Sequence, residues 1–313
     1  MATAPGDGLQ GEAVLAIEAL RIHYELPAVT VRAVDGVDLE VRGNEVLGLA
    51  GESGSGKSTL ALGVLQLLRP PGRVVAGRVR FGDVDLLELE ERDLRALRWR
   101  QFAYIPQGSM SALNPVMRLR SQFADTLAAH GERMQPAALR ERLTEVLQGV
   151  GLEADILPRY PHELSGGMRQ RVCIALALLL GPRLIIADEP TSALDVISQR
   201  VVLETLAAAR QAIGASMLLI GHDLALLAQV TDRLGVMYAG RIVELGATGQ
   251  LFANARHPYT RRLIASIPDL HDRRAFGGAA PEDGTRWLLE APLHEVAPGH
   301  FVRPWQPAGG TAP

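Results

Sequence analysis

The chain contains the sequence VLGLAGESGSGKST at residues 46–59. Val46–Ala50 is a short apolar run typical of a buried strand, and Leu60–Leu68 is predicted to be a helix. The loop between them has glycine at positions 51, 54 and 56. Glycines let backbone N–H groups converge on phosphate oxygens where a helix begins. The order of strand, glycine-rich loop and helix therefore predicts a phosphate-binding loop (P-loop), with an ordinary glycine-rich turn as the alternative.

Lysine usage singles out one residue of this loop. Of the 32 Lys and Arg residues in the chain, Lys57 is the only lysine. The compact ammonium group of a lysine fits among the N–H groups of such a loop, where the planar fork of an arginine would collide with them. We therefore predict that Lys57 binds the β- and γ-phosphates of a nucleotide and that the Ser58 hydroxyl ligates Mg²⁺. A general bias toward arginine is the competing explanation.

A second apolar run ends in two carboxylates. Leu184–Ala187 is followed by Asp188 and Glu189. A carboxylate at a strand end suits the coordination shell of Mg²⁺, so Asp188 is a candidate ligand. Glu189 points elsewhere and is a candidate to orient or deprotonate an attacking water. Together with the P-loop, the pair favours hydrolysis of a nucleotide over binding alone, and a solvated acidic turn is the alternative.

The sequence LSGGMRQR at residues 164–171 predicts a second anion-binding surface. It precedes an apolar helical run, so the Ser165 hydroxyl and the N–H groups of Gly166 and Gly167 are expected at a helix N-terminus. With the P-loop and the carboxylate pair, this segment resembles the signature of ATP-binding cassette (ABC) proteins. The resemblance covers residues 14–268 and implies ATP and Mg²⁺ as ligands.

The resemblance implies an α/β fold, the ABC-type ATPase core of the P-loop NTPases, with a parallel central sheet, an N-terminal antiparallel β-subdomain and an inserted helical subdomain. The sequence periodicities agree with this fold. Short strands are expected in Val14–Val41 and Val74–Phe81, further strands at 184–188 and 217–220, and a helix in Pro136–Val150. The expected domains are a flexible tail (1–11), a nucleotide-binding domain (12–255, with the helical subdomain at about 109–165) and a C-terminal extension with a mobile end from residue 304 (256–313).

The resemblance also implies roles for single residues. Gln107 would contact the metal and the water, and His222 would contact the γ-phosphate and help to position Glu189. Asp195 would serve communication between two ATPase subunits, and Tyr24 would stack on adenine. The alternatives are a surface-loop residue for Gln107, a structural histidine, a helix N-cap for Asp195 and a packing role for Tyr24. The expected ATP-binding loop comprises Gly51, Glu52, Ser53, Gly54, Ser55, Gly56, Lys57, Ser58 and Thr59.

The family resemblance implies partners. In ABC proteins the signature of one subunit closes over the P-loop of another, so Ser165, Gly166 and Gly167 would bind ATP across a dimer. The sequence HPYT at residues 257–260 resembles the C-terminal extension of oligopeptide and dipeptide importer ATPases. Membership of that group implies two transmembrane permease subunits, a second ABC ATPase and, indirectly, an extracytoplasmic solute-binding protein. A heterodimer of ATPases is favoured over a homodimer, at the cytoplasmic face of the membrane.

Composition excludes several other classes. A net charge of -3 with 47% hydrophobic residues argues against a disordered or nucleic-acid-binding chain. The single cysteine, Cys173, excludes a disulfide framework and a cluster of thiolates, so no iron–sulfur cluster is expected. The longest apolar stretch, Val172–Leu180, is predicted to be helical and falls well short of the roughly 20 residues that span a bilayer.

Two other functions compete with the peptide-importer hypothesis. A soluble ABC ATPase that is not coupled to transport would carry the same motifs. A small-molecule kinase would use the P-loop but would leave residues 164–171 without a role. Within the importer hypothesis, nickel or another small solute is an alternative cargo, because the solute cannot be identified from this subunit.

Overall fold

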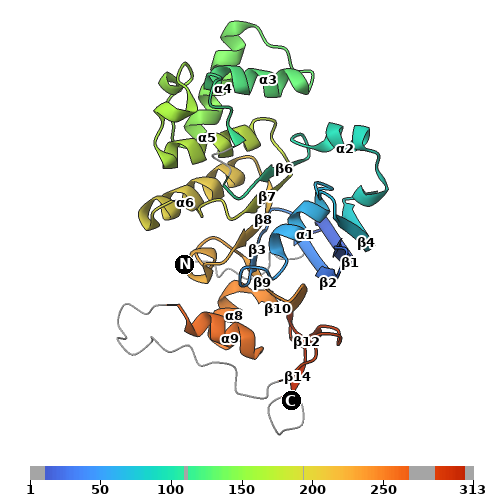
Figure 1. Cartoon of the computed structure of the whole chain (residues 1–313). Coiled ribbons are helices and arrows are strands. Elements are labelled where there is room, and N and C mark those ends of the chain that lie inside the picture. The colour runs from blue at the N-terminus through green and yellow to red at the C-terminus, as the bar shows by residue number, and fades with distance from the viewer. Residues whose placement is uncertain (1–10, 109–111, 193, 268–285, 307–313) are drawn as a thin grey trace. The chain divides into compact units, whose positions relative to one another are not determined.

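The computed structural model describes residues 11–108, 112–192, 194–267 and 286–306 (Figure 1). The chain divides into two compact units. The P-loop unit consists of Leu15–Val41, Glu45–Leu87 and Leu219–Pro313. The carboxylate unit consists of Met1–Val14, Arg42–Asn44 and Glu88–Leu218.

The P-loop unit contains an antiparallel sheet at its N-terminal end. Its strands are β1 (Ala13–Glu25), β2 (Thr30–Arg42), β4 (Gly72–Phe81) and β5 (Val84–Asp85), in the order β2-β1-β4-β5. Leu15 and Ile17 of β1 are buried, as is Ala16 between them, and burial alternates only further along the strand, where Leu20 and Ile22 are buried. The predicted antiparallel subdomain is confirmed, although β1 and β2 are each 13 residues long rather than short.

A second sheet in the P-loop unit carries the phosphate loop. Strand β3 (Val46–Ala50) is buried along its whole length and runs parallel to β9 (Arg233–Tyr238). Strand β10 (Arg241–Ala247) is antiparallel to β9 and is followed by β13 (His300–Val302) and β12 (His294–Ala297), in the order β12-β13-β10-β9-β3. A parallel strand that is covered on both faces is apolar throughout, as the sequence of β3 indicates.

The carboxylate unit combines parallel strands with helices. Strand β6 (Phe102–Ile105) is parallel to β7 (Leu184–Asp188), and β8 (Ser216–Gly221), which crosses the boundary between the units, follows β7 in the sheet order. The helices are α2 (Glu91–Leu97), α3 (Leu119–Ala129), α4 (Pro136–Gly149), α5 (Gly166–Leu178) and α6 (Val196–Ala212), with 3-10 turns at Ala154–Ile156 and Pro161–Glu163. Helices α3 and α4 lie in the segment that was expected to be helical, of which residues 109–111 are outside the described chain.

Two predicted helices have different boundaries. Helix α1 spans Lys57–Val64, because Gly56 has the left-handed φ of 105° that precedes its first turn and Gln66 ends it at a φ of 50°. Helix α5 spans Gly166–Leu178, so the predicted helix N-terminus at Ser165, Gly166 and Gly167 is confirmed. The apolar run from Val172 marked only the later part of this helix, because glycine has a low helix propensity.

The C-terminal residues fold onto β10. After α7 (Leu224–Leu227) and α8 (Thr248–Asn254) come α9 (Pro258–Ala265) and the paired strands β11 (Arg286–Trp287) and β14 (Trp305–Gln306). The fully buried Glu244 carboxylate accepts the backbone N–H groups of Arg256 and His257, at 2.7 and 3.1 Å, and lies 2.8 Å from His300 Nε2. The extension was expected to be mobile from residue 304, yet residues 305–306 form β14; residues 307–313 and the tail at 1–10 lie outside the described chain.

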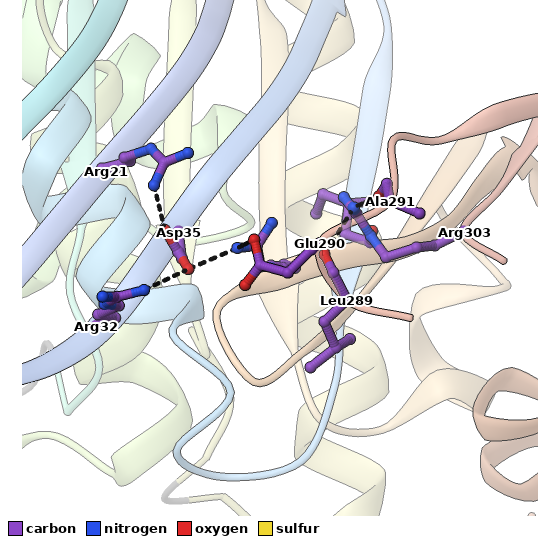
Figure 2. A network of polar contacts seen from close by, with 9 residues as sticks. Arg21, Arg32, Asp35, Leu289, Glu290, Ala291 and Arg303 are labelled. Atoms are coloured by element: carbon purple, nitrogen blue, oxygen red, sulfur yellow. Dashed lines mark hydrogen bonds and ion pairs between the residues drawn. The ribbon is translucent and has the colours of Figure 1, made fainter. Parts of the chain in front are cut away.

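A buried network of charges joins β2, β10 and the C-terminal residues (Figure 2). The Asp35 carboxylate accepts hydrogen bonds from Arg21, at 2.9 Å, and from Arg241, at 2.6 Å, and Arg241 also pairs with Glu290 at 2.9 Å. Arg303 donates to the backbone carbonyls of Ile242, Leu289 and Ala291. Buried charges are tolerated where they are paired and hydrogen-bonded. The C-terminal residues around Glu290 and Arg303 are therefore held by specific polar contacts.

Within the described residues, none of the helices combines the length and the apolar composition that crossing a bilayer requires.

His257 makes the stability of the C-terminal fold depend on pH. Burial, with a contribution from the nearby Arg303 cation, lowers the pKa of His257 from 6.5 to about 3. Because the unfolded chain binds this proton more readily, the stabilisation is complete above pH 6.5 and is lost as the pH falls toward 3.

The variant His257→Asn keeps a side-chain acceptor for the Tyr259 N–H and cannot titrate. Between pH 7.5 and pH 5, the thermal midpoint of the wild type should fall roughly 2–4 °C further than that of the variant. His294→Asn, at an exposed position of β12, is the control and should behave as the wild type. An equal fall in wild type and His257→Asn would contradict the prediction.

Candidate nucleotide-binding site

Two glycines of the P-loop are enforced by close backbone packing. A Cβ atom at Gly51 would lie 2.3 Å from the carbonyl oxygen of Met237, and one at Gly56 would lie 2.1 Å from that of Ala33. The Ser55 carbonyl also accepts the N–H of Gly240, in the turn between β9 and β10, at 3.0 Å. The loop therefore rests on β2 and on the β9–β10 turn, and no side chain other than hydrogen fits at either glycine.

The Lys57 side chain is buried and turns back over the loop. Its ammonium group donates to the carbonyl oxygens of Gly51 and Glu52, at 2.8 and 3.0 Å, and to the Ser55 hydroxyl at 3.3 Å. These contacts fix the cation above the N-terminus of α1, where the first N–H groups of the helix point out of the helix. A cation and converging N–H groups at one point form a site for a phosphate anion.

Tyr24 lies beside the first turn of α1. Its hydroxyl is 3.4 Å from the Thr59 hydroxyl. Tyr24 therefore lies next to the end of the P-loop, and stacking of its ring on adenine stays a prediction.

In the carboxylate unit, the ends of β6 and β7 bring two predicted residues together. Gln107 Nε2 donates to Glu189 Oε2 at 3.0 Å. Both residues follow neighbouring parallel strands, whose carboxyl ends meet at one edge of the sheet. Glu189 has a φ of 45°, a left-handed conformation that is strained for a non-glycine residue and is concentrated at functional sites.

Asp188 has a partner that sequence reasoning did not identify. The carboxylate is almost fully buried at the end of β7 and accepts a hydrogen bond from the Tyr104 hydroxyl at 3.3 Å. Burial and the Asp188 charge raise the pKa of Tyr104, so its phenol remains a proton donor. The only signal in the sequence was an aromatic residue with a polar end inside an apolar strand.

The signature residues lie at the exposed start of α5. Ser165 is the N-cap, and its hydroxyl accepts the N–H of Met168 at 3.3 Å. A Cβ atom at Gly167 would meet nothing within 4 Å. The first turn is therefore uncovered beside Gly167, and binding of an anion by its N–H groups stays a prediction.

The remaining predicted residues lie at element boundaries. Asp195 is the N-cap of α6 and accepts from the N–H and the hydroxyl of Ser198, at 3.0 and 2.6 Å, which lowers the pKa of Asp195. Capping therefore accounts for Asp195 structurally, and its role between subunits stays a prediction. Ala193, in the same loop, is outside the described residues, and His222 is exposed just after β8.

Two residues that sequence reasoning did not place in the site contact the P-loop from α9. The Glu52 N–H donates to the Tyr259 hydroxyl at 3.0 Å, and the Glu52 carboxylate pairs with Arg262 at 2.6 Å. Tyr259 belonged to the HPYT segment that indicated the C-terminal extension, but nothing in that segment pointed to the loop.

Comparison with known proteins places the chain in a family. The family model described as ABC transporter matches residues 34–192, and the model described as oligopeptide/dipeptide transporter, C-terminal region, matches residues 243–291. The chain therefore belongs to the ABC transporter ATP-binding family and is an ATPase of the ABC type.

Among its relatives are proteins named for peptide transport. The chain is 42% identical to the dipeptide transport ATP-binding protein DppD of Caldanaerobacter subterraneus subsp. tengcongensis, over 81% of this chain and 78% of that protein. It is 36% identical to the oligopeptide transport ATP-binding protein OppD of Bacillus subtilis, over 93% and 88% of the two chains.

Solved structures support the fold. The ATP-binding cassette MJ0796, solved as a dimer in a post-hydrolysis state with ADP and Pi, matches 75% of this chain and 98% of its own, with a TM-score of 0.66 and 24% identity. CbiO1 from Clostridium perfringens, part of the ABC transporter complex cbiONQ, matches 77% and 91% with the same TM-score and identity. The ABC-type α/β fold predicted from the sequence is confirmed.

The single lysine permits a direct test of the P-loop. With the α-amino group blocked, an amine-reactive reagent should modify Lys57 alone, and MgATP should protect it because the phosphates cover the ammonium group. Peptide mass spectrometry measures the extent of labelling, and MgAMP is the control ligand, since it lacks the β- and γ-phosphates. Labelling that MgATP does not slow would show that Lys57 lies outside the nucleotide site.

Proposed function

We propose that this chain is the ATP-hydrolysing subunit of an importer for dipeptides or oligopeptides and that it works with two separate permease subunits. The match of residues 243–291 to the C-terminal region of oligopeptide and dipeptide transporters carries the proposal, because an ABC core alone does not indicate a cargo. The names of the relatives support it. The proposed location is the cytoplasmic face of the membrane, as a peripheral subunit.

The P-loop unit would bind the phosphates of ATP. Residues Gly51–Thr59 form the cradle, in which a Cβ atom at Gly51 or Gly56 would strike backbone, and Lys57 supplies a buried cation. The family resemblance implies Ser58 of this unit and, from the carboxylate unit, Gln107 and Asp188 as the Mg²⁺ ligands, and oxygen donors of these kinds are the ones that Mg²⁺ prefers. When bound, Mg²⁺ would neutralise charge on the β- and γ-phosphates.

Glu189 would act as the general base. The Gln107 amide donates to Glu189 Oε2 at 3.0 Å and so orients the carboxylate, which would accept a proton from water. His222 would contact the γ-phosphate. Tyr24 would stack on adenine.

A second ABC ATPase would complete each site. Ser165, Gly166 and Gly167 at the open start of α5 would bind the ATP held by the P-loop of that partner, and Asp195 would connect the two subunits. We favour a heterodimer, with a homodimer as the alternative. An iron–sulfur cluster is not part of the proposal, since the only cysteine is buried on α5.

Two alternatives have the same ATPase chemistry. The subunit would serve nickel or another small solute if its permeases and binding protein select one, and it would be a soluble ABC ATPase if it has no permease. The domain limits proposed for the chain are a tail (1–11), the nucleotide-binding domain (12–255) and the C-terminal extension (256–313).

Glu189→Gln should separate ATP binding from hydrolysis. The amide is nearly isosteric but cannot take a proton, so turnover should fall about 100-fold or more while MgATP still binds. Phosphate release and equilibrium binding of a fluorescent ATP analogue measure the two properties. Glu204→Gln, at an exposed position of α6, is the matched control. Near-normal hydrolysis by Glu189→Gln would remove Glu189 from the mechanism.

Copurification tests coupling to transport. Tagged Glu189→Gln protein, solubilised from membranes of its native host in detergent and MgATP, should retain two multi-span permeases and a second ABC ATPase, identified by mass spectrometry. The same preparation without nucleotide is the control. If only soluble partners copurify, the soluble-ATPase alternative replaces the importer.

A further inference from the structure

Three contacts from different parts of the P-loop unit meet on Glu52. Its N–H donates to the Tyr259 hydroxyl at 3.0 Å, its carbonyl accepts from the Lys57 ammonium at 3.0 Å, and its carboxylate pairs with Arg262 at 2.6 Å. One P-loop residue thus joins the phosphate-binding lysine to two residues of α9, which lie 207 and 210 positions away in the sequence.

Helix α9 is firmly placed. His257 caps its N-terminus by accepting the Tyr259 N–H at 3.2 Å, and the His257 N–H is itself held by the buried Glu244 carboxylate. Tyr259 is buried, and its ring centroid lies 4.6 Å from that of Tyr238, at the end of β9. The Tyr259 hydroxyl is therefore a fixed acceptor, because its ring cannot move without disrupting this packing.

Tyr259 also places Arg262. The Arg262 guanidinium lies 5.2 Å from the centre of the Tyr259 ring, a distance at which a cation is attracted to the ring face. Arg262 is about a third exposed, and Glu52 is about half exposed, so water partly screens their ion pair.

We propose that Tyr259 and Arg262 are positioning residues of the ATP site: through Glu52 they hold the carbonyl that fixes the Lys57 ammonium and neutralise the carboxylate beside the phosphates. The C-terminal extension would then contribute to nucleotide binding by positioning P-loop residues. This inference rests on the proposed ATP site and extends it to residues that do not touch the nucleotide.

The two residues act by different physics. Tyr259 satisfies a backbone N–H and so determines the geometry of the loop, an effect that salt does not change. Arg262 cancels the charge of Glu52, which would otherwise repel the polyphosphate. That repulsion acts across solvent, where the Debye length is about 10 Å at 0.1 M salt and about 3 Å at 1 M. Salt therefore distinguishes the two contributions.

The test uses the full-length chain with Tyr259→Phe, Arg262→Gln, Glu52→Gln and the double variant Glu52→Gln/Arg262→Gln. Arg261→Gln is the matched control, because Arg261 is exposed on the same helix and donates to the Ala255 carbonyl instead of the P-loop. The dissociation constant of a fluorescent MgATP analogue and the KM and kcat for MgATP hydrolysis are measured in 0.05 M and 1 M NaCl.

Tyr259→Phe should raise the dissociation constant and KM about three- to tenfold at both salt concentrations. Arg262→Gln should raise them about two- to fivefold in 0.05 M NaCl and very little in 1 M NaCl. Neutralising Glu52 in the double variant should restore affinity to near the wild-type value. In Tyr259→Phe and Arg262→Gln kcat should change less than about twofold, because the reacting groups are untouched.

Lys57→Ala distinguishes failure of this inference from failure of the ATP site. If Lys57→Ala abolishes binding while Tyr259→Phe and Arg262→Gln bind as the wild type does, the positioning role is wrong and the ATP site stands. If Lys57→Ala binds normally, the site itself is wrong. A loss of affinity in Arg262→Gln that is equal at both salt concentrations and persists in the double variant would also overturn the electrostatic role. If Tyr259→Phe does not fold, Arg262→Gln still tests the inference, because Arg262 is partly exposed and its substitution should leave the fold intact.

Discussion

Much of this structure depends on the close approach of the P-loop backbone to the backbones of β2 and β9. Gly51 and Gly56 lie so close to the carbonyls of Met237 and Ala33 that a Cβ atom could not be accommodated. The loop can take this position because β3 and β9 are parallel neighbours and the Ala33 carbonyl of β2 lies beside Gly56. Two strands and one turn thus hold a segment whose chemistry comes from its backbone N–H groups.

In the carboxylate unit, the ends of two parallel strands position the functional side chains. Gln107 and Glu189 meet because β6 and β7 are parallel and end together, and Asp188 is buried one residue earlier under the Tyr104 hydroxyl. The two adjacent carboxylates have different partners, since Asp188 accepts from Tyr104 and Glu189 accepts from Gln107. In the proposed function the two adjacent acids have different roles, Asp188 as a metal ligand and Glu189 as the general base.

The sequence predicted the parts of this fold that depend on local pattern. The apolar runs at 46–50 and 184–188 are strands, and Pro136–Gly149 is the expected helix, because periodicity and flanking turns are local properties. The helix at Lys57 was placed too late, since its start depends on the backbone conformation of Gly56. Tyr104, Tyr259 and Arg262 were not placed in the site, because their partners lie far away in the chain and no periodicity records such a contact.

Buried charge explains why the C-terminal residues cannot be treated as an appendage. Glu244 and Arg241 lie on β10, inside the nucleotide-binding core, and both are almost fully buried. The hydrogen bonds of Glu244 come from Arg256, His257 and His300, while Arg241 shares Asp35 with Arg21 and also reaches Glu290. Without these donors, the buried carboxylate would lose its hydration without compensation, which costs on the order of several kcal/mol. The C-terminal extension therefore supplies hydrogen-bond partners for buried charges of the P-loop unit. Because these partners hold the extension against β10, Tyr259 and Arg262 lie within reach of Glu52.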